Sequence, residues 1–125
     1  RPEDLATIRT YHEEYAAAVK AQDALAMIAT NAAFHSAIAD AGRNPYFSSL
    51  FRRLLDEGRR ILRLYYQSYE DQLPQRFVDE HQEMIDVIAA RDVEAADRIG
   101  REHAEQIVAQ VQRLFTRNER LDIQL

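Results

Sequence analysis

The sequence predicts an all-α fold, an antiparallel bundle of about five helices. Only three Gly and three Pro occur among the 125 residues, so few positions force a helix to stop. Apolar residues recur three and four positions apart over long stretches, which is the spacing of a helix with one buried face. Short connections between such helices are typical of antiparallel neighbours in a bundle. The length suits one domain, which we expect over residues 1–125.

Capping residues delimit the first two expected helices. Pro2 fits the first turn of a helix that runs to about residue 20, because the N–H that proline lacks would be unpaired there. Asp23 is a favoured N-cap for a second helix over residues 24–41. Gly42 is a typical residue to end that helix.

Three further helices follow from the breakers and the apolar periodicity. Asn44 and Pro45 restart the chain, and apolar residues at helical spacing predict a third helix over residues 46–70. Pro74 separates it from a fourth helix. Asp92 then caps the last helix, which continues toward the C-terminus.

Composition excludes several classes of function. The absence of Cys rules out disulfides and thiolate metal sites. No apolar run approaches the roughly 20 residues of a membrane span, and no signal peptide is recognisable, so we expect a cytoplasmic protein without membrane contact. The net charge of −5 argues against DNA binding by these residues, because phosphates need a basic surface. Since the chain opens with Arg rather than Met, we expect a fragment of a longer protein.

Two of the four histidines are predicted to face each other. His81 and His103 lie at about equal distances from the turn expected around Arg91 and Asp92. Positions equidistant from the turn of an antiparallel hairpin lie at the same height, here roughly 15 Å from the tip at 1.5 Å per residue. Both histidines also fall on apolar stripes, so we expect both to point into the bundle.

A third histidine completes a candidate site. His35 lies on the inner face of its helix, and Asn31 lies one turn before it on the same face. Three inward imidazoles suit zinc, nickel, copper or iron. These positions are equally compatible with ordinary core histidines, so the residues alone leave the choice open. His12, which is followed by two glutamates, is predicted to be exposed and outside the site.

Three motifs resemble a known family. The first is Asn31-Ala-Ala-Phe34-His35 followed by Asn44-Pro45. The second is a stretch that opens with Glu80-His81 and ends at Asp92, and the third consists of Ala95, Ala96 and His103. Together they resemble the FCD domain, the C-terminal effector-binding domain of GntR-type, FadR-subfamily bacterial transcription regulators. The resemblance covers essentially the whole chain.

The resemblance implies a regulatory role rather than an enzymatic one. In this family an Asp and three histidines hold a divalent metal inside the bundle, which here corresponds to Asn31, His35, His81 and His103. Zinc or nickel is the expected metal. The family also implies a small organic acid effector bound at the metal, a homodimer, and an N-terminal winged-helix domain that binds DNA.

The chain departs from the family pattern in three respects. Asn31 replaces the usual Asp and brings no negative charge to the metal. No winged-helix domain lies within these 125 residues. The first helix of the family also has no counterpart, because residues 2–5 resemble the start of the second. An apolar groove is therefore expected, to be filled by that helix or by a partner.

An acidic effector needs a cationic or hydrogen-bonding partner near the metal. Arginine suits a carboxylate, because its guanidinium forms two parallel hydrogen bonds. We select Arg59, which lies nearest the inner face, together with Tyr65 and Asn31 as effector-binding residues. The alternative is a solvated face on which the arginines of this segment pair with Asp56 and Glu57. These arginines are Arg52, Arg53, Arg59, Arg60 and Arg63.

Two other functions stay open. A metal-dependent, hydrolase-like enzyme would use the open position of a three-histidine site to activate water. It lacks an evident general base, because Glu80 and Glu102 each precede a histidine by one residue and are expected to point about 100° away from it. A plain helical dimerisation module would contain the same histidines as core residues only.

Overall fold

The described part of the chain folds into six helices and contains no strand, which confirms the all-α prediction. The computed structural model describes the backbone of residues 1–122 and the side chains of residues 1–116. The helices are α1 (Pro2–Ala21), α2 (Ala24–Ala41), α3 (Pro45–Glu57), α4 (Arg59–Gln67), α5 (Gln75–Ala89) and α6 (Val93–Asp122). None of the helices searched in this part is long and apolar enough to cross a membrane.

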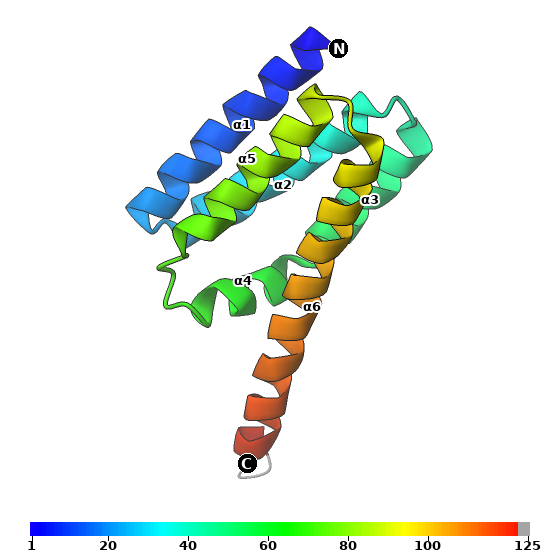
Figure 1. Ribbon diagram of the computed structural model, residues 1–125. Coiled ribbons are helices and arrows are strands. Elements are labelled where there is room, and N and C mark those ends of the chain that lie inside the picture. The colour runs from blue at the N-terminus through cyan, green and yellow to red at the C-terminus, as the bar shows by residue number, and fades with distance from the viewer. Residues whose placement is uncertain (123–125) are drawn as a thin grey trace.

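Most neighbouring helices pack directly against each other, but over the described residues α2 does not pack directly against α5 or α6. α1 packs against α2 and α5, and the three lie side by side, while α4 crosses below them (Figure 1). α6 packs against α5 and α4 and extends past α4 to the C-terminal end (Figure 1). Within the described chain, no Cα atom of α2 lies within 8 Å of a Cα atom of α5 or α6. Side chains therefore bridge α2 to the α5–α6 hairpin.

Side-chain caps fix three of the helix starts. Asp23 accepts a hydrogen bond from the backbone N–H of Ala26 at 3.1 Å, as the sequence predicts for an N-cap. Asp92 accepts one from the N–H of Ala95, also at 3.1 Å. Asn44 caps α3 in the same way, directly before Pro45.

The third expected helix is wrong as a single element. Residues 46–70 form α3 and α4, which are separated at Gly58, so the bundle has six helices rather than about five. A Cβ atom at position 58 would lie only 3.2 Å from the carbonyl oxygen of Leu54, and glycine avoids this contact while the chain bends. The second segment also stops early, because Glu70 and Asp71 both have positive φ angles.

Two apolar clusters form the core. One surrounds Tyr15, Met27, Tyr66 and Phe77, near α4. The other contains Ile8, Phe34, Met84, Ile85 and Ile99, nearer the α5–α6 turn. The candidate site lies between them, since the ring of His81 contacts an aromatic ring of each cluster.

Loss of the α6 cap should measurably destabilise the protein. We expect Asp92→Ala to lower the free energy of unfolding by about 1 kcal/mol, because the N–H of Ala95 loses its side-chain acceptor. Urea unfolding measures the change. Asp97→Ala is the control, since Asp97 forms only an exposed ion pair with Arg101 and should change stability by less than about 0.5 kcal/mol. Equal effects of the two substitutions would contradict the capping role.

Candidate metal centre

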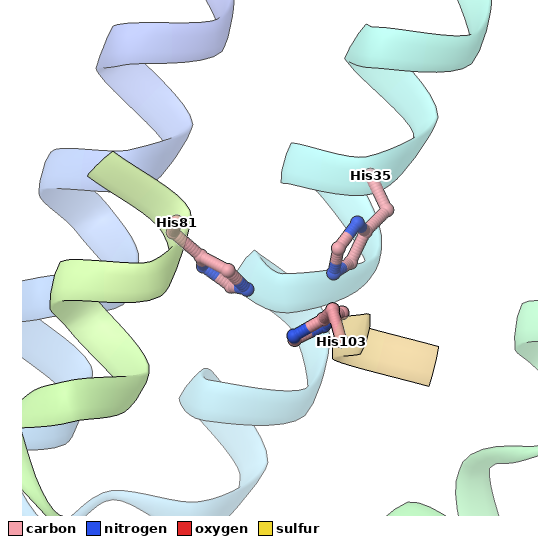
Figure 2. Close-up of side chains that lie close together, drawn as sticks. All are labelled: His35, His81 and His103. Carbon is pink, nitrogen blue, oxygen red and sulfur yellow. The ribbon is translucent and has the colours of Figure 1, made fainter. Parts of the chain in front are cut away.

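Three histidines from three helices meet inside the bundle. His35 comes from α2, His81 from α5 and His103 from α6, and their rings point toward one another (Figure 2). One ring nitrogen of each lies within 4.8 Å of those of the other two. The ring centroids are 5.0 Å apart for His35 and His81, 5.3 Å for His35 and His103, and 5.6 Å for His81 and His103. The structure thus brings together the histidines that the sequence groups.

Aromatic packing fixes the ring of His81 within this histidine cluster. Its side chain is only 1% exposed. The ring stacks on Phe34 of α2 with centroids 4.3 Å apart, and it contacts Tyr15 of α1 at 4.5 Å. Such contacts restrict the ring to one orientation. His35 and His103 are half-buried and line a cavity beside the cluster.

Burial keeps the three imidazoles uncharged at neutral pH. It lowers the pKa of His35 to about 3, with a further contribution from the neighbouring His103. Burial also lowers the pKa of His81, as do the imidazoles around it. For His103 burial again lowers the pKa, although Glu80 acts in the opposite direction. Neutral imidazole is the form that binds metal, because the nitrogen lone pair is free.

The donor set fits a divalent transition metal. Among the described residues, the buried side-chain atoms without a hydrogen-bond partner are Nδ1 of His12, Nδ1 of His81, Nδ1 of His103 and Oε2 of Glu80, so most of them lie in or beside the histidine cluster. Buried polar atoms are nearly always paired, so unpaired ones indicate a missing ion, water or ligand. Three neutral imidazoles whose ring nitrogens lie within 4.8 Å of one another form the kind of donor set that binds zinc or nickel.

Glu80 faces the cluster, and the expectation that it points away is wrong. Its Oε2 atom lies 3.5 Å from Nδ1 of His103. The sequence contains the signal, because Glu80 lies eleven residues before Arg91 and His103 lies eleven after Asp92, which puts them at the same height of the hairpin. Metal-binding histidines commonly donate their second ring N–H to such a carboxylate. Glu102 is exposed, as expected.

His12 is buried, although the sequence analysis expects it to be exposed. Its side chain is 8% exposed, and its ring lies 6.0 Å from that of Phe34 and 6.2 Å from that of His81. The periodicity of α1 contains the signal, since His12 lies one turn after the buried Ile8 and one before the buried Tyr15. It does not belong to the group of three whose nitrogens converge.

Two of the three expected effector-binding residues lie at the cluster. Asn31 is buried and, like His35 and His103, lines the adjoining cavity. Tyr65 is buried in α4 and shares with His81 and His103 a small space of about 20 Å³. Burial raises the pKa of Tyr65, so its hydroxyl stays protonated and can donate a hydrogen bond.

Arg59 does not lie at the cluster. Its side chain is exposed and pairs with Asp56 at 3.3 Å. It lines a second cavity, which is bordered by α1 and α2 and also contains Arg52 and Asp40. The bend at Gly58 turns the start of α4, so the inner face extrapolated from α3 does not continue to Arg59. The alternative interpretation fits better here, because Arg59 pairs with Asp56 and Arg53 pairs with Glu57. Arg52 and Arg63 pair instead with Asp40 and Asp71.

The cavity beside the histidines has a volume of about 590 Å³. Residues of α2, α3, α4, α5 and α6 line it. Most of the lining is aliphatic, with Asn31, His35 and His103 as the polar part. The cavity is therefore mainly apolar.

These features define an all-α domain with a buried histidine cluster next to an open apolar cavity. A family model described as FCD domain matches residues 1–106, which include all three histidines. The chain therefore belongs to the FCD domain family, as the three motifs predict. Domains of this family are effector-binding regions of transcription regulators. Comparison with curated proteins and with solved structures gave no significant match.

The buried histidines should make the metal-free protein sensitive to mild acid. Their pKa values are lower in the folded state, so below about pH 6.5 the unfolded chain binds protons that the folded chain does not. The free energy of unfolding should therefore fall from pH 7 to pH 5.5, by at most about 1.4 kcal/mol per pH unit for each histidine. Urea unfolding in the presence of a chelator measures this slope.

The matched variant for this measurement is His81→Phe, which keeps an aromatic ring against Phe34 and removes one titrating group. We expect a shallower slope for this variant. A wild-type stability that stays constant between pH 7 and pH 5.5 would rule out neutral, buried histidines.

Proposed function

We propose that this chain is the effector-sensing domain of a transcription regulator, in which a divalent metal in the bundle interior binds a small organic acid. The observation that carries this proposal is the convergence of one nitrogen each from His35, His81 and His103 within 4.8 Å. Membership of the FCD domain family supports the regulatory role. Zinc and nickel are the metals whose ligand preferences best match three imidazoles.

Asn31 suits the centre to an anionic ligand, and Glu80 orients one of its histidines. The side-chain oxygen of Asn31, one helical turn before His35, is the fourth candidate ligand. Imidazole and amide ligands are all neutral, so they leave the full charge of a bound cation in place. Glu80 lies beyond the histidines and orients the ring of His103. When bound, the metal would supply a positive centre for a carboxylate oxygen of the effector.

The helices that supply the ligands also define how a signal would leave the site. α2 reaches the α5–α6 hairpin through side chains alone, so a ligand bound between them changes the forces that hold the two parts together. We propose that this change alters the position of a winged-helix DNA-binding domain outside these residues, in a cytoplasmic homodimer. Effectors act by such differential binding to two arrangements.

Metal binding should stabilise the folded protein. Zinc added to chelator-treated protein at 100 times its dissociation constant should raise the free energy of unfolding by about 2.7 kcal/mol, because the folded state alone presents the site. Elemental analysis should give one metal per chain. His81→Ala should abolish the stabilisation, since it removes one of the three ligands.

His12→Ala is the control, because it also removes a buried imidazole but one outside the group of three. It should destabilise the protein and still respond to zinc. A zinc response that survives His81→Ala would exclude this centre. If the zinc-loaded protein instead consumed a candidate acid, the hydrolase-like alternative would replace the sensor.

Glu80 should strengthen metal binding through His103. We expect Glu80→Gln to weaken zinc binding 10- to 100-fold, the usual effect of losing a carboxylate that orients a metal-binding histidine. Isothermal titration of metal-free protein measures the affinity. Glu102→Gln, at an exposed position of α6, removes the same charge elsewhere and should leave the affinity within about twofold. Equal losses in both variants would indicate a general charge effect.

A further inference from the structure

In the cavity beside the histidine cluster, the polar side chains lie at the cluster and the remaining lining is apolar. Its only polar side chains among the described residues are Asn31, His35 and His103, all of which belong to or adjoin the cluster. The rest of its lining consists of aliphatic residues, Met84, Phe51 and two glycines. A ligand of this cavity therefore meets polar groups near the histidines and hydrocarbon elsewhere.

Charge is excluded from the cavity wall. No Lys, Arg, Asp or Glu of the described chain lines it, and Arg52 and Arg59 line the second cavity instead. A carboxylate placed away from the histidines would therefore lose its hydration without gaining a partner, which is strongly unfavourable. At the histidines, a divalent cation combined with the carboxylate of Glu80 leaves one net positive charge. The cavity thus suits one carboxylate and no more.

The size of the cavity indicates how large the apolar part can be. About 590 Å³ lies within the range of small-molecule sites and exceeds the needs of acetate or lactate many times. Leu54 and Ile61, at its border, are 56% and 45% exposed. An apolar ligand body would cover these side chains and bury further hydrocarbon surface.

We infer that the effector is a monocarboxylic acid with a sizeable apolar body, such as a medium-chain fatty acid. This inference rests on the proposed function, because it takes the metal as the partner of the carboxylate. It narrows the class of effector, since it excludes dicarboxylic, tricarboxylic and sugar acids. The aliphatic wall, rather than an arginine, determines which acid binds.

Affinity should rise with chain length and fall with a second charge. Each buried methylene contributes about 0.8 kcal/mol, which corresponds to about fourfold in affinity. With zinc-loaded protein, isothermal titration should show octanoate binding at least 100-fold more tightly than acetate. Octanedioate, which has the same chain length and a second carboxylate, should bind at least tenfold more weakly than octanoate. Equal binding of acetate and octanoate, or tighter binding of octanedioate, would overturn the inference.

Gly100 offers a direct way to fill the cavity. It lines the cavity from α6, and a Cβ atom built on it meets no atom of the described structure within 4 Å. Gly100→Leu should therefore fold, and it should lower octanoate affinity at least tenfold with little effect on acetate. Gln106→Leu adds the same side chain at an exposed position of α6 outside the cavity and should leave octanoate binding unchanged. Full octanoate affinity in Gly100→Leu would place the ligand elsewhere.

A prior zinc titration separates the two possible failures. If zinc does not bind, the proposed function fails and this inference fails with it. If zinc binds with one ion per chain but octanoate binds no better than acetate, only the effector class is wrong, as it would be if the groove accommodated a helix. If octanoate binds equally well to metal-free protein, the metal does not hold the carboxylate, and the inference is overturned.

Discussion

The rest of this fold depends on the burial of three uncharged imidazoles between α2 and the α5–α6 hairpin. A buried ring nitrogen without a partner is unfavourable by about 1–3 kcal/mol, and two of the three rings have one. The surrounding elements maintain this arrangement. Phe34 and Tyr15 hold one ring from two sides, Glu80 contacts another, and the arginines of α3 and α4 form ion pairs away from the cluster. Most of the unpaired buried polar atoms of the described residues therefore lie in this cluster or on Glu80 beside it, and His12 carries the other.

The parts that the sequence predicts correctly depend on local chemistry or on hairpin register. An N-cap such as Asp92 acts within three residues, so its position in the sequence is enough to locate the start of a helix. The histidines of α5 and α6 lie at similar distances from a short turn, and this spacing alone brings them together. The inward direction of His35 is predicted separately, from the apolar stripe of α2. Motifs at three separate places then identified the FCD domain family.

The parts that could not be predicted depend on how helices bend and rotate relative to one another. A single glycine, Gly58, breaks the expected helix, so the inner face extrapolated across it places Arg59 on the wrong side of the bundle. The 100° spacing of successive side chains describes Glu80 on an isolated helix, whereas in the bundle α6 packs beside α5 and brings His103 to Glu80. The charged neighbours of His12 suggest an exposed residue, but the apolar stripe through Ile8 and Tyr15 determines its burial.

Two consecutive residues of α2 contact the ring of His81. Phe34 stacks on the ring of His81, and His35 meets that ring edge-on at 5.0 Å. Because successive side chains leave a helix about 100° apart, rolling α2 about its axis in either direction pulls one of the two away. The two contacts therefore oppose rotation of α2 about its own axis relative to α5. A rearrangement of α2 that occurs by rotation about its axis must therefore break one of these two contacts.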